Sequence, residues 1–221
     1  MKVAIDGPAG AGKSVIARAA AKELGFIYVD TGALYRGIGL YALEKGRDTT
    51  SPEEIVPLLD EIKEELCFVG GEQHVVLNGK DVNGMIRTEA VSKAASDVSA
   101  IPEVRKFLFD MQRDIAEKND VIMDGRDIGT VVLPDAELKI FLTAKPEIRA
   151  KRRVLQLAEK GITEKYEDVL DDILKRDWND SHRETAPLKQ AEDAIYIDNS
   201  EILLADDIEN VKKMILEAKC K

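Results

Sequence analysis

The segment that most constrains the fold of this chain lies at residues 7–14: Gly7, Pro8, Ala9, Gly10, Ala11, Gly12, Lys13 and Ser14. It fits the pattern G-x-x-x-x-G-K-[ST], in which backbone N–H groups curl around phosphate oxygens. The lysine then reaches the β- and γ-phosphates, and the serine hydroxyl can ligate Mg²⁺. Such a loop needs a strand before it and a helix after it. The apolar run at residues 2–5 predicts that strand, and the alanine-rich stretch at 12–24 predicts that helix. The alternative, a glycine-rich turn that contains a lysine by chance, does not explain these two neighbours.

The rest of the chain alternates short apolar runs with helical patterns. Strands are predicted at residues 2–5, 26–29, 121–123, 138–142 and 194–197, and helices at 12–24, 31–46, 88–98, 102–117, 146–161, 165–183 and from the last strand to the chain end. We expect Thr31 to cap one helix, and Ser51 with Glu54 to form a capping box for a further one. This alternation predicts an α/β fold with a parallel sheet between helices.

Two further features of this pattern bear on the site. Glycine pairs break the β-rich stretch at residues 66–82, which predicts hairpins and a small β insert. Ligands of a parallel α/β sheet bind at the carboxyl ends of its strands. The polar residues that follow the predicted strands are therefore the candidates for a site.

Two such segments carry arginine. Arg36 lies about one turn into the helix that follows Asp30, where it suits a second phosphate, on an acceptor; a surface arginine on an ordinarily capped helix explains the pattern equally well. The segment 124–127 reads Asp-Gly-Arg-Asp. Asp124 suits the role of ordering Mg²⁺ or its waters, and the planar fork of Arg126 suits a phosphoryl group. The alternative is a polar turn with an internal ion pair.

A third group of charges lies further along the chain. Arg149, Lys151, Arg152 and Arg153 crowd one predicted helix. In the next helix Arg176, Asp180 and Arg183 share a face, because they are spaced by four and three residues. The pattern suits a lid that closes over phosphates, or a solvated helical hairpin with salt bridges.

Composition narrows the class of protein. With 221 residues, 44% of them hydrophobic, the chain suits one compact unit with a proper core. A net charge of −10 argues against a general nucleic-acid binder. Cys67 and Cys220 are too few for a disulfide framework or a zinc site, and His74 and His182 have no partners for a triad or a metal cluster. We see no signal segment and no membrane span, and expect a cytoplasmic protein with reduced thiols.

Several motifs together resemble one family. They are "IDGPAGAGKS", "VDTGALYR", "IRTEAVSKAASDVSAIPEVR", "DGRDIGTVVLPDAELKIFLTA", "RAKRR" and "KRDWNDSHRETAPL". Over essentially its whole length the chain resembles bacterial cytidylate kinase, the (d)CMP kinase of the nucleoside monophosphate kinase group. The resemblance implies a three-layer P-loop kinase fold in a single unit. Its core would span about residues 1–30, 88–145 and 190–221, its acceptor-binding region about 31–87 with a β insert at about 61–87, and its lid about 149–185.

The resemblance also implies residue roles. ATP would bind to residues 7–14 and to Arg153, and Ser14 and Asp124 would hold Mg²⁺. CMP would bind to Thr31, Arg36, Ser96, Arg105, Arg126, Asp127, Arg176, Asp180 and Arg183. Lys13, Arg126, Arg176 and Arg183 would act in catalysis. Ser96, Arg105 and Asp127 match the cytosine-reading trio of the family, and a carboxylate such as that of Asp127 can accept a hydrogen bond from the N4 amino group of cytosine.

The expected reaction is ATP with CMP or dCMP to give ADP with CDP or dCDP. Its partners are these nucleotides, with no nucleic acid or membrane, and the family suggests a monomer. Two other functions stay open from the residues. One is an alcohol kinase of shikimate-kinase type, which would not need the cytosine trio. The other is a nucleotide-hydrolysing switch protein, which would predict a guanine-reading N-K-x-D motif that we do not find.

Overall fold

The computed structural model describes residues 1–159 and 161–220. By their contacts, the residues form two compact units. The first unit comprises Met1–Phe26 and Asp120–Lys221, and the second comprises Ile27–Asn119. The second unit thus joins the predicted acceptor-binding region to the two helices that follow it along the chain.

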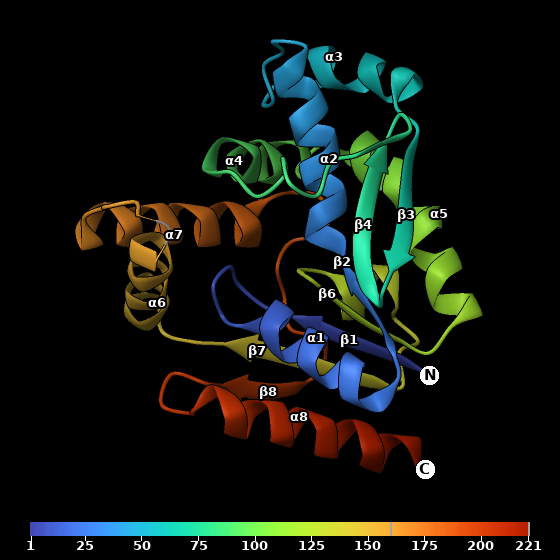
Figure 1. The fold of residues 1–221 in the computed structure, drawn as a ribbon, viewed down its shortest axis with the longest axis vertical. Helices are drawn as coiled ribbons and strands as arrows, with labels where there is room; N and C mark the ends of the chain where they lie inside the picture. The colour runs from blue at the N-terminus through green and yellow to red at the C-terminus, as the bar shows by residue number, and fades with distance from the viewer. Residues whose placement is uncertain (160, 221) are drawn as a thin grey trace. The chain divides into compact units, whose positions relative to one another are not determined.

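The first unit is built on parallel strands. They are β1 (Lys2–Asp6), β6 (Val121–Gly125), β7 (Leu138–Thr143) and β8 (Ile195–Asp198). They lie side by side in the order β6-β1-β7-β8, with Ile5 opposite Asp124 on one side of β1 and opposite Ile140 on the other (Figure 1). The central strand β1 is apolar and fully buried at Val3, Ala4 and Ile5, as a strand covered on both faces must be. The predicted parallel α/β sheet is confirmed.

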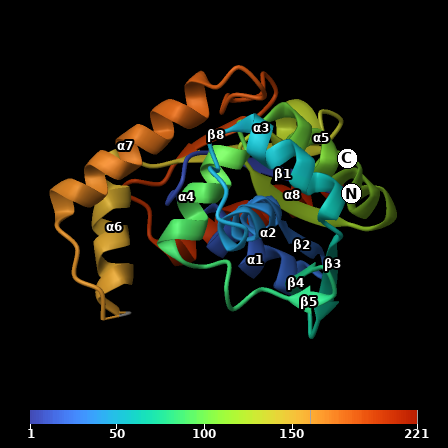
Figure 2. The same ribbon diagram turned by 90° about the horizontal axis from the view of Figure 1, so that it is seen from above.

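Helices of the first unit follow its strands. The helix α1 (Lys13–Leu24) packs against α8 (Leu204–Lys219), and a short π-helix, η2 (Ile128–Val132), follows β6. The helices α6 (Pro146–Glu159) and α7 (Tyr166–His182) pack against each other around Ala150, Leu157 and Val169 (Figure 2). Among the described residues, no helix combines the length and apolar content needed to cross a lipid bilayer.

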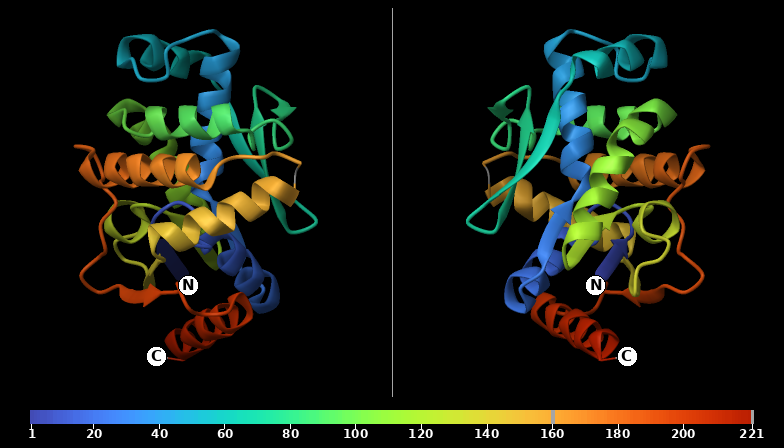
Figure 3. Two further views of the ribbon diagram at one scale, coloured as in Figure 1. Left: turned by 90° about the vertical axis from the view of Figure 1, so that its left-hand side faces the viewer. Right: turned by 90° about the vertical axis from the view of Figure 1, so that its right-hand side faces the viewer.

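The second unit surrounds one apolar core. Its elements are β2 (Ile27–Asp30), α2 (Thr31–Glu44), α3 (Pro52–Ile55), the 3₁₀ helix η1 (Val56–Glu61), β3 (Glu64–Val69), β4 (Glu72–Leu77), β5 (Lys80–Asp81), α4 (Glu89–Val98) and α5 (Pro102–Lys118). The antiparallel β3-β4-β5 sheet confirms the predicted β insert. The helix α2 lies between α4 and the β3–β4 hairpin (Figure 3). It can approach α4 closely because Gly39 has no Cβ to meet the backbone of Ala94 and Ala95.

Two helices begin where expected, but their capping bonds differ from expectation. The cap of α2 is Asp30, whose side chain accepts from Ala33 N–H at 3.0 Å, and Thr31 is the first helical residue. The prediction of Thr31 as the cap is wrong because a better acceptor stands one residue earlier. Ser51 precedes α3 but makes no capping bond, and its hydroxyl donates to Glu53 instead. The predicted capping box is therefore absent at Ser51.

A buried acid lies in the core of the second unit. Glu64 is 5% exposed, and neither of its carboxylate oxygens has a hydrogen-bond partner among the described residues. It rests against Gly37, where an added Cβ would lie 1.9 Å from Glu64 Oε1. Burial raises the pKa of Glu64 well above its ordinary value. The acid is thus neutral at low pH and must ionise in an apolar setting as the pH rises.

We expect Glu64→Gln to flatten the decrease in stability at alkaline pH. Because the folded-state pKa is raised, the contribution of Glu64 to stability is full below the unfolded pKa and is lost as pH rises through the folded pKa. The variant should exceed the wild-type Tm at pH 9 by about 3 °C or more, and by less at pH 5. Thermal unfolding followed by circular dichroism measures both. The neighbouring change Glu65→Gln, at an acid paired with Lys63 on the surface, should leave the pH profile unaltered.

Candidate active site

The loop between β1 and α1 has the backbone that phosphate binding requires. Gly7 has φ +148°, and a Cβ there would lie 1.9 Å from the carbonyl oxygen of Leu142, so only glycine fits. Gly12 adopts φ +94° at the start of α1. The first N–H groups of α1 therefore follow directly on the loop, where the positive end of a helix favours an anion.

Lys13 is held within this loop. Its side chain is buried, and its ammonium donates to the carbonyl oxygen of Pro8 at 2.8 Å. Burial lowers the pKa of Lys13 to about 7, and the positive charge of Arg126 acts in the same direction. Three carboxylates oppose this effect: those of Asp124, Asp6 and Asp180. The ammonium thus lies close to three acids and one arginine of the first unit. A bound phosphate would replace the Pro8 carbonyl as its hydrogen-bond partner.

The side chains of Ser14 and Asp124 face each other. Ser14 Oγ donates to Asp124 Oδ2 at 2.8 Å, which joins the start of α1 to the end of β6. Asp124 is 4% exposed. Hydroxyl and carboxylate oxygens are ligands that Mg²⁺ accepts, and the ion usually takes only one or two protein ligands beside phosphates and waters. This pair fits that donor set, and no group of three or more acidic, histidine or cysteine side chains among the described residues offers another metal site.

Arg126 links the strand end to α7. Its Nε donates to Asp180 Oδ2 at 2.8 Å, and its Nη1 donates to the Gly125 carbonyl at 3.2 Å. Burial alone would lower the pKa of Arg126, but the charges of Asp180 and Asp124 outweigh it and raise the pKa. The guanidinium is therefore charged and fixed in orientation beside the loop.

Asp180 gathers the arginines of α7 as well. Burial would raise the pKa of Asp180, but Arg126, Arg176 and Arg183 together keep it below its ordinary value. Arg183 donates to the carbonyl of Ala186 and its Nη2 lies 3.8 Å from Asp127 Oδ1. Arg176 of α7 and Arg183, directly after α7, thus join Arg126 around the Asp180 carboxylate. The spacing of Arg176, Asp180 and Arg183 along the sequence predicted that these three residues share a face.

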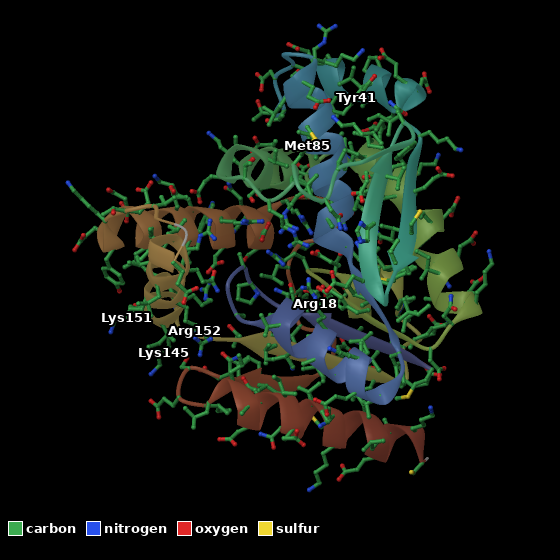
Figure 4. All side chains as sticks on the ribbon, in the orientation of Figure 1. Arg18, Tyr41, Met85, Lys145, Lys151 and Arg152 are labelled. Carbon is green, nitrogen blue, oxygen red and sulfur yellow. The ribbon has the colours of Figure 1, made fainter. Side chains whose placement is uncertain are left out.

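Three arginines of α6 have separate surroundings. Arg149 is buried, donates to the carbonyl of Ala9 in the loop at 3.0 Å, and pairs with Asp177 of α7. Arg152 donates to the side chain and the carbonyl of Asn199 at 3.1 and 2.9 Å. Arg153, the predicted ATP ligand, follows on the same helix. Lys151 is exposed and points away from α6 (Figure 4).

In the second unit the Asp30 carboxylate forms ion pairs with two arginines. Its Oδ2 lies 3.5 Å from Arg36 Nη1 and 3.1 Å from Arg87 Nη2. Gln73 fixes the backbone of Asp30 by one donated and one accepted hydrogen bond. Thr31, directly next in the chain, is buried at the first turn of α2. The predicted residues Thr31 and Arg36 thus both lie on α2, and the acid that precedes Thr31 pairs with both Arg36 and Arg87.

The other predicted residues of the second unit lie on α4 and α5. Arg105 is 9% exposed, donates to the Ser99 carbonyl at 3.2 Å, and lies 5.6 Å from the centre of the Tyr35 ring. Ser96 is half-buried on α4, three residues before Ser99. The guanidinium of Arg105 therefore has a fixed orientation, because it contacts Tyr35 of α2 and the Ser99 carbonyl in the turn between α4 and α5.

Sequence reasoning did not predict the contacts that four residues make with these groups: Asp6, Arg87, Arg149 and Asn199. Asp6 directly follows the strand predicted at residues 2–5 and precedes the loop, so its position could have marked it as a candidate. Asn199 donates to the Ala11 carbonyl at 2.9 Å across 188 residues, and no local pattern announces such a bond. Arg149 had been grouped with its neighbours as a lid charge, whereas it ties α6 to the loop.

Comparison with known proteins gives consistent matches. The model of the family described as cytidylate kinase matches residues 3–217. A protein named cytidylate kinase from Caldicellulosiruptor saccharolyticus is 52% identical over 97% of this chain and 95% of its own length. Another so named, from Lactobacillus gasseri, is 48% identical over 97% of this chain and 94% of its own. Among solved structures, a shikimate kinase from Bacteroides thetaiotaomicron covers 98% of this chain and 96% of its own at 16% identity and a TM-score of 0.47, a likeness too distant to bear on activity.

Proposed function

Because this chain belongs to the cytidylate kinase family, we propose that it transfers the γ-phosphoryl group of ATP to CMP or dCMP, giving ADP and CDP or dCDP. One observation of the site supports phosphoryl transfer most directly. Lys13, the Ser14–Asp124 pair and the Arg126–Asp180 pair all lie around the loop of the first unit. A site of this kind can align two phosphates and offset their repulsion.

The acceptor needs no general base. A phosphate monoester with a second pKa of about 6 is largely dianionic at pH 7, so its oxygen is already a nucleophile. What the chain must supply is charge and alignment. Lys13 binds the β- and γ-phosphates of ATP, and Arg126 binds the acceptor phosphate with its planar fork. Ser14 and Asp124 would hold Mg²⁺, which would supply positive charge to offset that of the ATP phosphates.

The lid-side arginines add to this charge. Arg176 and Arg183 stabilise the transferring phosphoryl group, and Asp180 keeps the guanidinium groups around it oriented until nucleotide binds. Arg153 contributes to ATP binding from α6. Closure of α6 and α7 over the nucleotides excludes water, which would otherwise accept the phosphoryl group.

The second unit is proposed to bind the acceptor. Thr31 and Arg36 take its phosphate, and Ser96 and Arg105 take the base together with Asp127. A carboxylate accepts from the N4 amino group of cytosine, whereas the O4 carbonyl of uracil would repel it. A polar contact of this kind discriminates between bases by roughly 1–3 kcal/mol. We also propose that the protein works as a cytoplasmic monomer; Cys67 and Cys220 are both exposed free thiols.

Release of ADP, coupled to an indicator reaction, tests the function. With ATP, we expect CMP and dCMP to give rates about 10-fold or more above those with UMP or AMP. Without an acceptor, ATP turnover should be negligible, which separates a kinase from a hydrolysing switch. Equal or better rates with UMP or AMP would exclude the cytosine assignment. Phosphorylation of shikimate but not of CMP would establish the alcohol-kinase alternative, which membership of the family does not favour.

A further inference from the structure

Asp6, the last residue of β1, makes an unusual pair of bonds. Its side chain is 4% exposed. Its Oδ1 accepts from Ile128 N–H at 2.8 Å and its Oδ2 accepts from Gly129 N–H at 2.7 Å. These two amides are the first of the π-helix η2, which begins directly after Asp127. The carboxylate of Asp6 on β1 therefore accepts from two neighbouring backbone N–H groups that lie more than a hundred residues later in the sequence.

The first N–H groups of any helix lack partners within the helix. They are normally capped by the side chain that precedes the helix, and aspartate is among the best residues for this task. Here the preceding residue is Asp127, yet it has φ −145° and ψ 25° and makes no side-chain capping bond. Asp6, and not Asp127, accepts the hydrogen bonds of the first two amides of η2.

We propose that Asp6 is a positioning residue, which caps η2 and so fixes the backbone from which the Asp127 carboxylate reads the cytosine base. The inference rests on the proposed function, because it takes Asp127 as the residue that reads the base. Asp6 does not touch the base in this account. It acts through the backbone on which Asp127 stands.

The surroundings of η2 support this role. Asp6 is paired with Gly125 in the β1–β6 register, next to the strand end that carries Arg126. A Cβ on Gly129 would lie 3.2 Å from the Lys139 side chain and 3.4 Å from Asp6 Oδ2, so this turn of η2 is closely packed. Beyond the far end of η2, Lys139 donates to the Pro134 carbonyl at 2.7 Å. The segment is thus held at both ends, and Asp6 holds the end that carries Asp127.

Only a carboxylate offers two oxygens that can accept from the adjacent N–H groups of Ile128 and Gly129. An asparagine has one oxygen, and its amide group would turn an N–H toward a backbone N–H. Burial raises the pKa of Asp6 to about 6, against the lowering effect of the two backbone bonds, and the charge of Asp127 raises it too. Asp6 is therefore mostly ionised at pH 7, with both oxygens as acceptors.

Steady-state kinetics of Asp6→Asn with CMP and UMP tests the inference. We expect kcat/KM for CMP to decrease by about 10- to 100-fold, because small displacements of a positioned group are costly. UMP should lose less, so the CMP/UMP ratio should approach that of Asp127→Asn. In the double variant the ratio should not decrease further, since both changes act on one interaction. Loss of the Asp6 charge also lowers the pKa of Lys13 and should weaken ATP binding, which calorimetry measures; this effect is common to both acceptors and cancels in the CMP/UMP ratio.

The matched control is Glu137→Gln. The Glu137 carboxylate accepts from Lys2 N–H at 2.7 Å, so the same chemical change is made at the opposite end of β1 from Asp6. Its CMP/UMP ratio should equal that of wild type. If Asp6→Asn lowers both rates alike and keeps the ratio, Asp6 is only structural and the inference is overturned.

A different result separates this inference from the proposed function. If the wild type does not prefer CMP, the function itself is wrong. If wild type prefers CMP and Asp127→Asn abolishes that preference, the proposed function holds. The CMP/UMP ratio of Asp6→Asn then tests only whether Asp6 positions Asp127. Asp6→Glu, which keeps the charge but moves the oxygens by one methylene, gives the same comparison should Asp6→Asn not fold.

Discussion

Replacing Arg126 by alanine is expected to lower kcat/KM for CMP by about 10³-fold or more, mainly through kcat. The guanidinium is buried, charged and oriented by Asp180 at 2.8 Å, and it lies close enough to Lys13 to lower the pKa of the ammonium. A preoriented charge of this kind acts on the transition state at no cost of reorganisation. Its loss would also leave Asp180 buried without its hydrogen-bonded partner.

Initial rates over a range of CMP concentrations measure this effect. Arg126→Lys keeps the charge but not the planar fork, and should recover only part of the rate. Arg47→Ala, a change at an exposed arginine of the second unit, is the control and should match wild type. An increase in KM at unchanged kcat would mean that Arg126 only binds the substrate, and would contradict its role in the transition state.

Replacing Lys13 by methionine is expected to lower kcat by about 10²- to 10³-fold. Methionine fills the buried space next to Pro8 but removes the charge and the donors that serve the transferring phosphoryl group. The Lys13 ammonium is held at 2.8 Å from the Pro8 carbonyl, so it is already positioned in the loop before nucleotide binds. The methionine variant should fold, since it loses one hydrogen bond to a carbonyl and no apolar packing.

Single-turnover phosphoryl transfer with enzyme in excess over ATP measures this step without product release. Lys22→Met, in the last turn of the same helix, alters an exposed lysine and should leave the rate unchanged. Retention of more than about a tenth of the wild-type rate by Lys13→Met would show that the loop amides carry the stabilisation alone.

Most of the helices and strands could be predicted because their signals are local. Alternation of apolar runs with helical periods located β1, β6, β7, α1 and α5 within two residues. The capping bonds at Thr31 and Ser51 were less well predicted than the helix starts, because a cap is chosen by competition among neighbouring oxygens. At Thr31 the competitor was the carboxylate of Asp30, and at Ser51 the hydroxyl found Glu53.

Sequence alone determined the phosphate loop and the strand-end position of the Asp-Gly-Arg-Asp segment, because spacing along the chain dictates both. The family motifs extended this to a kinase that acts on CMP. Only the tertiary structure decided which partner each charge takes: Arg126 with Asp180, Arg149 with Ala9 and Asp177, and Asp6 with the amides of η2. The physical reason is that hydrogen bonds depend on distance in space, and these partners come together only when the parallel sheet brings separate strand ends to one edge.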